Sequence, residues 1–339
     1  MRSLTLIAFF LSIFSASAQL GGQTVFNSLN IQGSARVAAL GGNHFAVKDG
    51  DINIATINPS IIDSTMHRKV SFSYVDYFAK TNFGYATYGH QLNNKWTAVG
   101  TMQFISHGQM DELDPLGNNI GSFSAGEYSL VLGTSYKVDS LWSVGANLKT
   151  IYSNIDSYYS IGIATDFAVT YYKPTKRFVA SAVIKNVGTQ LHTFTEGTRE
   201  KLPFEMQISI SKRPQHAPFR FSLVYENLQK WDLTYVNPNA TLVTDPITGE
   251  IIEEKKFELG DQFMRHLVFG TEFLLSESFN FRVGYNYRRR QELKLQDKPA
   301  MAGISFGLGI RVKRLDISYA RAIYHAAGPA NHFTFAFKV

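Results

Sequence analysis

The sequence has no cysteine, few charged residues and no long apolar run after residue 18. Without cysteine it can form no disulfide bridge, thiolate metal site or lipidated N-terminal cysteine. The missing apolar runs of about 18 residues exclude a bundle of membrane helices. The net charge of +6 is spread along the chain, unlike the clustered basic face of a nucleic-acid-binding protein. Aromatic residues are abundant, with 26 Phe and 17 Tyr, and this composition excludes a disordered chain.

The first residues have the pattern of an export signal. Arg2 is the only charge in residues 1–18, Leu4 to Phe14 form an apolar core, and the small residues Ala16-Ser17-Ala18 follow it. We therefore expect residues 1–18 to be a cleaved signal peptide, with Gln19 as the mature N-terminus. A membrane anchor is the alternative, but this apolar run is short for that role.

From residue 69 to the C-terminus, apolar and polar residues alternate with a period of two. In Phe279 to Arg288, for example, one face is aromatic or aliphatic and the other is polar or glycine. Only a β-strand sorts its residues in this way. Fourteen such runs are expected, at 69–78, 83–91, 95–107, 125–137, 141–153, 159–172, 177–188, 203–213, 218–229, 265–275, 278–288, 300–312, 314–325 and 331–338.

The lengths of these runs favour a membrane barrel over a soluble β-sandwich. Most reach the ~9–11 residues that a tilted strand needs to cross hydrocarbon. Their connections alternate between short and long, as in outer-membrane barrels, and 79–82 is the exception. The last run is apolar at every second residue from Phe333 to Val339. We therefore predict an all-β fold, with residues 69–339 forming a transmembrane antiparallel barrel of about 14 strands in the cell outer membrane.

Residues 19–68 do not have the pattern of a membrane strand. They are rich in glycine and contain an Asn58-Pro59 turn. Ser34 to Leu40 is expected to form a short helix that ends at Gly41. Such a segment precedes the first strand, so it could plug the barrel or lie as an arm on its periplasmic side.

The motifs Ser34 to Gly42, Phe45 to Val47, Asp49 to Asp51 and Asn58-Pro59-Ser60 resemble the N-terminal hatch of the FadL-like outer-membrane superfamily. Further motifs extend the resemblance over nearly the whole mature chain, and together they are similar to the PorQ family, the outer-membrane barrel component of the type IX secretion system of Bacteroidota. These motifs are Phe123 to Tyr128, Asn186 to Leu191, Ala217 to Ser222, Leu228 to Tyr235, Asp245 to Glu250 and Tyr285 to Leu295.

This resemblance implies a non-enzymatic role in an attachment complex at the cell surface. The family's barrel holds a PorZ-like surface protein, together with PorU-like and PorV-like members. The complex processes secreted cargo and joins it to lipopolysaccharide. The alternative function is that of a FadL-like transporter for hydrophobic small molecules, which needs an apolar route through the wall or bore.

Motifs for catalysis, cofactors and metals are absent from the sequence. It contains no His-Glu-x-x-His, no P-loop and no Gly-x-Ser-x-Gly elbow. His107 with Asp111 or Asp114, and His325, are the only residues that could support a barrel enzyme. The acidic run at Asp111 lacks the ligand spacing of a dedicated calcium loop. We therefore expect no catalytic residue, no cofactor and no metal.

Two outer connections carry candidate binding residues. Arg288, Arg289 and Arg290 form a basic cluster that could contact lipopolysaccharide phosphate, or could be a solvated rim. The connection 230–264 far exceeds the ~12–15 residues above which a loop is usually functional or disordered. Its apolar and aromatic residues could dock a surface partner or form a self-packed cap. The docking candidates are Trp231, Tyr235, Ile247, Ile251 and Phe257.

Charged residues also occur on the expected inner faces of the strands, where burial would be costly without partners. We expect them to pair inside the barrel. They are Lys149, Asp166, Glu205, Glu226, Glu272 and Arg282.

Overall fold

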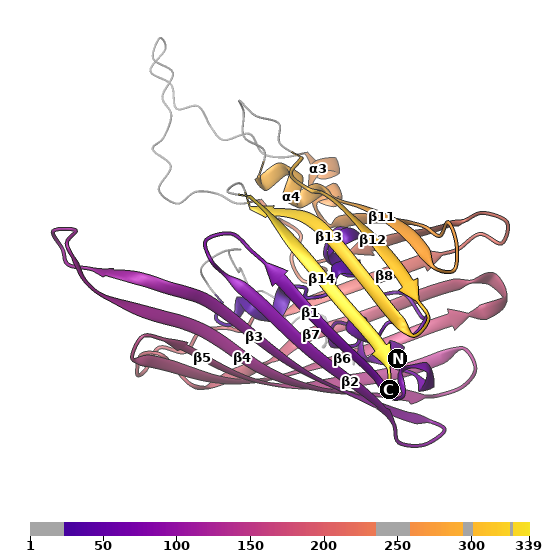
Figure 1. Cartoon of the computed structure of the whole chain (residues 1–339), viewed down its shortest axis with the longest axis horizontal. Helices are drawn as coiled ribbons and strands as arrows, with labels where there is room; N and C mark the ends of the chain where they lie inside the picture. The colour runs from indigo at the N-terminus through magenta and orange to yellow at the C-terminus, as the bar shows by residue number, and fades with distance from the viewer. Residues whose placement is uncertain (1–23, 235–257, 294–300, 326–327) are drawn as a thin grey trace, which may run out of the picture.

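The computed structural model describes residues 24–234, 258–293, 301–325 and 328–339. Fourteen antiparallel strands in this part of the chain form a closed barrel (Figure 1). Consecutive strands pair, and β1 closes the barrel by pairing with β14. This confirms the predicted fold. The strands are β1 (Lys69–Asp76), β2 (Asn82–Gln91), β3 (Trp96–Leu113), β4 (Asn119–Lys137), β5 (Trp142–Ile155), β6 (Tyr158–Lys173), β7 (Phe178–His192), β8 (Glu205–Lys212), β9 (Phe219–Tyr225), β10 (Leu267–Phe273), β11 (Phe279–Asn286), β12 (Ile304–Val312), β13 (Leu315–His325) and β14 (Gly328–Lys338).

The wall of the barrel is apolar outside and polar inside. In β8, Ile208 and Ile210 are 45% and 39% exposed, whereas Gln207 and Ser209 are each 1% exposed. A soluble sandwich would bury the isoleucines, because apolar burial is the main favourable term in folding. Exposed apolar residues with polar residues buried behind them are instead expected of a wall that faces hydrocarbon.

Aromatic side chains gather at two levels on the outside of the wall. Strand β4 has one residue at each level, Tyr128 and Tyr136. They are separated by about 26 Å along the strand, or by about 20 Å of height at a tilt of about 40°. These levels resemble the aromatic girdles at the two edges of a membrane barrel's apolar band. Near the short turns, ring centroids lie 4.9 Å apart in Trp96–Tyr136, 5.0 Å in Trp142–Tyr171 and 5.3 Å in Phe219–Phe273. Toward the loop end they lie 6.4 Å apart in Tyr128–Tyr152 and 6.1 Å in Tyr152–Tyr159.

The two ends of the barrel differ. Every connection at one end, here called the turn end, has six residues or fewer, and the C-terminus lies there too. The opposite end, called the loop end, has the long connections after β7, β9 and β11, together with short ones such as residues 156–157. At the loop end, β3 and β4 extend far beyond their neighbours (Figure 1). The expectation of a loop at 108–124 was therefore wrong. The strands continue past a bulge between Ser106 and Gln109 and turn only after Leu113.

Short helices lie inside the barrel and at its loop end. Within residues 24–68 they are η1 (Asn27–Asn30), α2 (Ala35–Ala39), η2 (Ile52–Thr56), η3 (Pro59–Ile61) and η4 (Ser64–Met66). The others are η5 (Pro174–Lys176) in a turn, and α3 (Leu259–Arg265) and α4 (Tyr287–Glu292) at the loop end. Among the described residues, no helix is long and apolar enough to cross a membrane.

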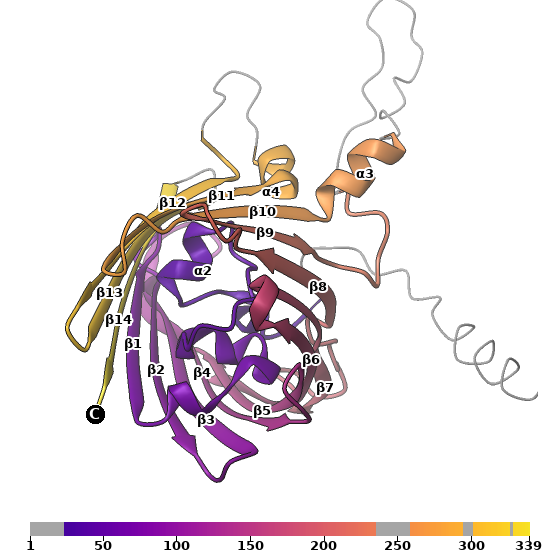
Figure 2. The ribbon, with the colours of Figure 1, turned by 90° about the vertical axis from the view of Figure 1, so that its right-hand side faces the viewer.

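Residues 24–68, here called the hatch, fill the lumen (Figure 2). Helix α2 contacts β11 to β14, whereas η3 contacts β4 to β6 on another part of the wall. The expected helix at Ser34 is present, and the Ser34 hydroxyl accepts a hydrogen bond from the backbone of Val37. Of the two placements left open by the sequence, the structure shows the plug.

Glycines on the inner face of the wall allow the hatch backbone to lie against the strands. A Cβ atom at Gly284 of β11 would stand 2.1 Å from the backbone nitrogen of Gly41. At Gly145 of β5, a Cβ atom would stand 2.4 Å from the carbonyl carbon of Pro59. Any side chain at these positions would push the hatch away, so they belong to the fit between hatch and wall.

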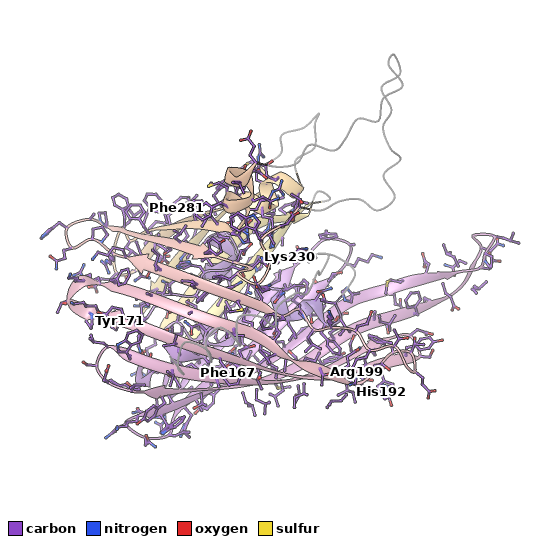
Figure 3. The ribbon with its side chains drawn as sticks, turned by 180° about the vertical axis from the view of Figure 1, so that it is seen from behind. Phe167, Tyr171, His192, Arg199, Lys230 and Phe281 are labelled. Atoms are coloured by element: carbon purple, nitrogen blue, oxygen red, sulfur yellow. The ribbon has the colours of Figure 1, made fainter. Side chains whose placement is uncertain are left out.

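We predict that Phe167→Arg destabilises the barrel much more than Tyr159→Arg. Phe167 is 52% exposed on the outside of β6, between the two aromatic levels (Figure 3). A lipid-facing arginine costs about 2–4 kcal/mol at mid-membrane and about 0–1 kcal/mol near the interface, where Tyr159 lies on the same outer face. Urea titration in lipid vesicles would measure both free energies of unfolding. Equal losses would show that β6 does not cross hydrocarbon at Phe167.

Candidate functional site

A largely buried network of charges joins the hatch to the wall near the turn end, and Asp49 is its most exposed member. Arg36 of α2 is at its centre and is 7% exposed. Its guanidinium lies 2.8 Å from Asp49 and 3.3 Å from Asp51, both in the hatch, and 2.9 Å from Glu272 of β10. Arg36 also donates a second hydrogen bond to Glu272 at 2.9 Å, so the contact with the wall is bidentate. Such paired contacts fix direction as well as distance.

Two wall arginines complete this network. Arg220 of β9 lies 2.8 Å from both Asp49 and Glu272, and Arg282 of β11 lies 3.1 Å from Glu272. Three cations thus face three carboxylates: Arg36, Arg220 and Arg282 against Asp49, Asp51 and Glu272. We call these six residues the hatch lock. A buried ion pair gives little net stability over an apolar pair, but removing one partner leaves a costly unpaired charge.

The lock keeps the hatch carboxylate of Asp49 ionised. Burial alone would raise the pKa of Asp49, but Arg36 and Arg220 outweigh it and hold this pKa well below its usual range. Because the folded pKa is depressed, Asp49 stabilises the fold fully above its unfolded pKa of about 4. That contribution is lost as the pH falls through the lower folded value.

Beside the lock, a cavity of about 570 Å³ opens at the turn end of the lumen. Its walls carry charges of both signs, including the lock residues, Lys69, Arg311 and Asp316. Lys69 reaches the carbonyl of Gly50 at 3.0 Å and the carboxylate of Asp316 at 3.4 Å. A cavity of this kind favours water and polar groups over hydrocarbon.

A second buried polar cluster lies across β5 to β8. Lys149 of β5 lies 2.8 Å from Asp166 of β6 and donates to the Asn186 side chain at 2.9 Å. Asn186 interrupts β7 with a positive φ of 58°, and its backbone N–H donates to Asp166 at 2.9 Å. The Asn186 amide also donates to the carbonyl of Pro203 at 2.8 Å. The irregular part of β7 is thus held in place by charge-assisted hydrogen bonds.

All six charges expected to pair inside the barrel do so. Two pairs join neighbouring strands, Lys149–Asp166 at 2.8 Å and Lys185–Glu205 at 2.8 Å. Glu272 and Arg282 belong to the hatch lock. Glu226 lies 3.1 Å from Arg288 and also accepts a hydrogen bond from Asn43 of the hatch.

At the loop end, aromatic rings stack around His266. The His266 ring lies parallel to Tyr225, with centroids 4.7 Å apart, and 5.6 Å from Trp231. Its Nδ1 lies 2.7 Å from the carbonyl oxygen of Glu226, and its Nε2 lies 3.0 Å from that of Trp231. Phe263 of α3 packs against Tyr225 from outside. These contacts fix the segment that follows β9 to the start of β10.

Part of this cluster faces outward. Trp231 is 50% exposed, Phe263 46% and Leu259 of α3 77%. We call these three residues the outer platform. Among the docking candidates from the sequence, Trp231 is thus on the surface. Tyr235, Ile247, Ile251 and Phe257 lie outside the described residues.

The three arginines of the basic cluster lie in α4, and Arg288 and Arg289 contact other parts of the protein. Arg288 pairs with Glu226, and Arg289 donates to the carbonyl of Gly41 in the hatch at 3.3 Å. Arg290 packs near Gly303. A contact of these arginines with lipopolysaccharide stays a prediction, and the structure gives Arg288 and Arg289 a role in holding the hatch.

Sequence reasoning missed four members of the hatch lock: Arg36, Asp49, Asp51 and Arg220. Asp49 and Asp51 were noted only as part of a hatch motif. The one usable signal was the alternation around Arg220, which puts it on the inner face of β9 like Glu272 on β10. No group of three or more His, Asp or Glu side chains in the described residues is arranged to hold a metal.

Solved structures with the same fold are outer-membrane proteins. The chain is similar to the toluene transporter TbuX of Ralstonia pickettii, with a TM-score of 0.57 and 11% identity over 93% of this chain and 100% of that one. It is also similar to the toluene transporter TodX of Pseudomonas putida, with a TM-score of 0.53 and 11% identity over 91% and 97% of the two chains. At such identities the likeness establishes the fold and nothing finer. No protein-family model matches the chain, and no curated protein matches it significantly.

We predict that Glu272→Gln loosens the hatch strongly, whereas Arg311→Ala does not. The first change leaves Arg36, Arg220 and Arg282 without their shared carboxylate, and breaking a buried pair costs about 3–5 kcal/mol. Arg311 is the matched control, because its pair with Asp316 at the same end is solvent-exposed and worth about 0–1 kcal/mol.

The measurement is limited proteolysis of the purified barrel in detergent, followed by mass spectrometry of the hatch peptides. Glu272→Gln should speed cleavage within residues 34–61, while the strands stay resistant. If both variants are cleaved at the wild-type rate, the lock does not hold the hatch.

Proposed function

We propose that this protein is an outer-membrane barrel that serves as a closed base for a surface partner in type IX secretion. The observation that carries the proposal is the filled lumen, in which buried ion pairs fix the hatch to the wall. Arg36 of the hatch donates two hydrogen bonds to Glu272 of the wall and three to Asp49 and Asp51 within the hatch. A rigid, plugged barrel suits an anchor, because the loops at its outer end keep fixed positions.

The outer platform supports this proposal. Trp231, Leu259 and Phe263 expose apolar surface at the loop end, on a base fixed by the stacked His266 ring. Exposed aromatic residues on a rigid base are typical of protein interfaces. The motifs that resemble the PorQ family suggest the partner: a PorZ-like surface protein, with PorU-like and PorV-like members of an attachment complex. Lipopolysaccharide and outer-membrane lipid would surround the barrel.

Passage of hydrophobic small molecules is the second candidate, and the comparison of folds favours it. TbuX and TodX are toluene transporters, and this chain matches nearly their whole length. The comparison gives no such support to the attachment role. The charged lining of the 570 Å³ cavity argues the other way, because an apolar solute gains little beside Arg220, Glu272 and Arg282.

Co-purification separates the two candidates. The tagged full chain would be isolated in mild detergent from membranes of its own host, as wild type, as Trp231→Ala/Leu259→Asp, and as the control Leu191→Asp. Leu191 is 62% exposed near the outer end of β7. We expect wild type and control to retain a surface protein, and the platform variant to release it into the medium while its barrel remains heat-modifiable on gels.

The outcome that contradicts the anchor is equally definite. The anchor is contradicted if no surface protein co-purifies with the barrel and if proteoliposomes that contain it take up a monoaromatic hydrocarbon faster than empty liposomes do. Passage would then be the function.

A further inference from the structure

The extended ends of β3 and β4 form a two-stranded ribbon beyond the barrel. The pairing of β2 with β3 ends at Asn82 with Ser106, and the pairing of β4 with β5 begins at Ala125 with Ile155. Between these limits, residues 109–113 pair only with residues 119–124 among the described strands. We call residues 107–124 the arm, which projects past the ends of the neighbouring strands in Figure 1.

The arm leaves strand edges unpaired. On the β2 side, residues 109–113 of β3 face no strand in the described part of the chain, so their outward backbone groups are open. Unpaired edges of this kind are templates for pairing with another chain, and proteins usually shorten or cover them. A lone two-stranded hairpin is also marginally stable in water, and a third strand makes it stable.

The surface of the arm is unusual for a solvated loop. Leu113, Leu116 and Ile120 are 58%, 87% and 62% exposed. The only charged residues of the arm itself are Asp111, Glu112 and Asp114, and the sequence has no lysine or arginine between Lys95 and Lys137. The arm therefore combines an open edge, exposed aliphatic side chains and uncompensated negative charge.

The turn of the arm is well built. The Asp114 carboxylate accepts hydrogen bonds from the backbone of Leu116 at 2.9 Å and of Asn118 at 2.8 Å, and from the Asn118 amide at 2.9 Å. The Asn118 contacts lower the pKa of Asp114. At its base, Gly108 takes a positive φ of 73° at the bulge, where the ribbon leaves the wall. Both ends of the arm are thus defined by local geometry.

We infer that the arm binds an extended, basic segment of a partner protein, which adds as a third strand to the edge of β3 at residues 109–113. Main-chain hydrogen bonds would supply the affinity, as in other strand-addition complexes. Lysine or arginine side chains opposite Asp111 and Glu112 would supply specificity, because opposite charges across neighbouring strands attract. This site is separate from the outer platform, and the inference does not depend on which candidate function is correct.

The test uses the purified full chain in detergent micelles and a fluorescent peptide with two adjacent lysines between valines, because Asp111 and Glu112 are consecutive and face opposite sides of the ribbon. A second peptide of the same sequence carries N-methyl groups on alternate residues along the pairing edge, which removes its donors without changing its charge. Fluorescence anisotropy would measure both affinities. Strand addition predicts that N-methylation weakens binding at least tenfold, and that salt weakens binding of the unmodified peptide.

Charge variants locate the site. Asp111→Asn/Glu112→Gln should weaken binding several-fold. The control Asp156→Asn should not, because Asp156 lies in the neighbouring β5–β6 turn at the same end. Equal affinity for the two peptides, equal effects of the two variants, or no binding at all would overturn the inference. Another possible occupant of the edge is a second copy of this chain. Sedimentation of the chain without peptide tests for it. A dimer that disappears when residues 109–123 are deleted would assign the edge to a second copy and overturn the inference.

Discussion

The buried carboxylate of Glu272 is the point on which the interior of this barrel depends. It sits on a wall strand, is fully buried, and contacts arginines from the hatch and from two neighbouring strands. A barrel with a polar inner face must satisfy that face, because buried polar groups without partners are costly. Here the hatch supplies partners that water would otherwise supply. The hatch and the wall therefore specify one another, and neither has its present structure without the other.

The same constraint explains the rest of the packing. Asn58 of the hatch donates to the carbonyl of Phe45 at 3.1 Å and to Thr170 of β6 at 3.3 Å, and Ser143 of β5 donates to the carbonyl of Ser60 at 2.7 Å. Polar contacts thus surround a small apolar center formed by hatch residues such as Phe45 and Ile61. The outside of the wall carries the remaining apolar surface, as expected for a barrel whose solvent is lipid.

Much of this fold could be predicted from the sequence. Period-two alternation located all fourteen strands, because a wall between lipid and a polar lumen forces every strand to alternate. It also indicated that Glu272 and Arg282 lie inside and are paired. It could not identify Arg36 as their partner, since 236 residues separate Arg36 from Glu272 and only the closed barrel brings them together.

The errors have physical causes as well. The arm was expected to be a connection because one alternating run was taken to end at residue 107 and the next to begin at 125. In the structure, Gly108 lies at a bulge, and Asp114 and Gly117 form a tight turn between longer strands. Helix α4 was partly assigned to a strand, because Tyr285 and Tyr287 continue the alternation of β11. The side chain of Asn286 ends that strand by accepting a hydrogen bond from the backbone of Arg289, which begins the helix. Such local capping contacts override periodicity over one or two residues.

The central claim is that hatch and wall form one cooperative unit. Hydrogen–deuterium exchange of the purified protein in detergent micelles tests it most directly, with peptides from residues 34–61 compared with peptides from β5 and β10. The account predicts that the hatch amides are protected for as long as the strand amides, and that both exchange together as urea is raised. Rapid exchange throughout the hatch, with the strands still protected, would contradict the claim, because the hatch would then unfold independently of the barrel.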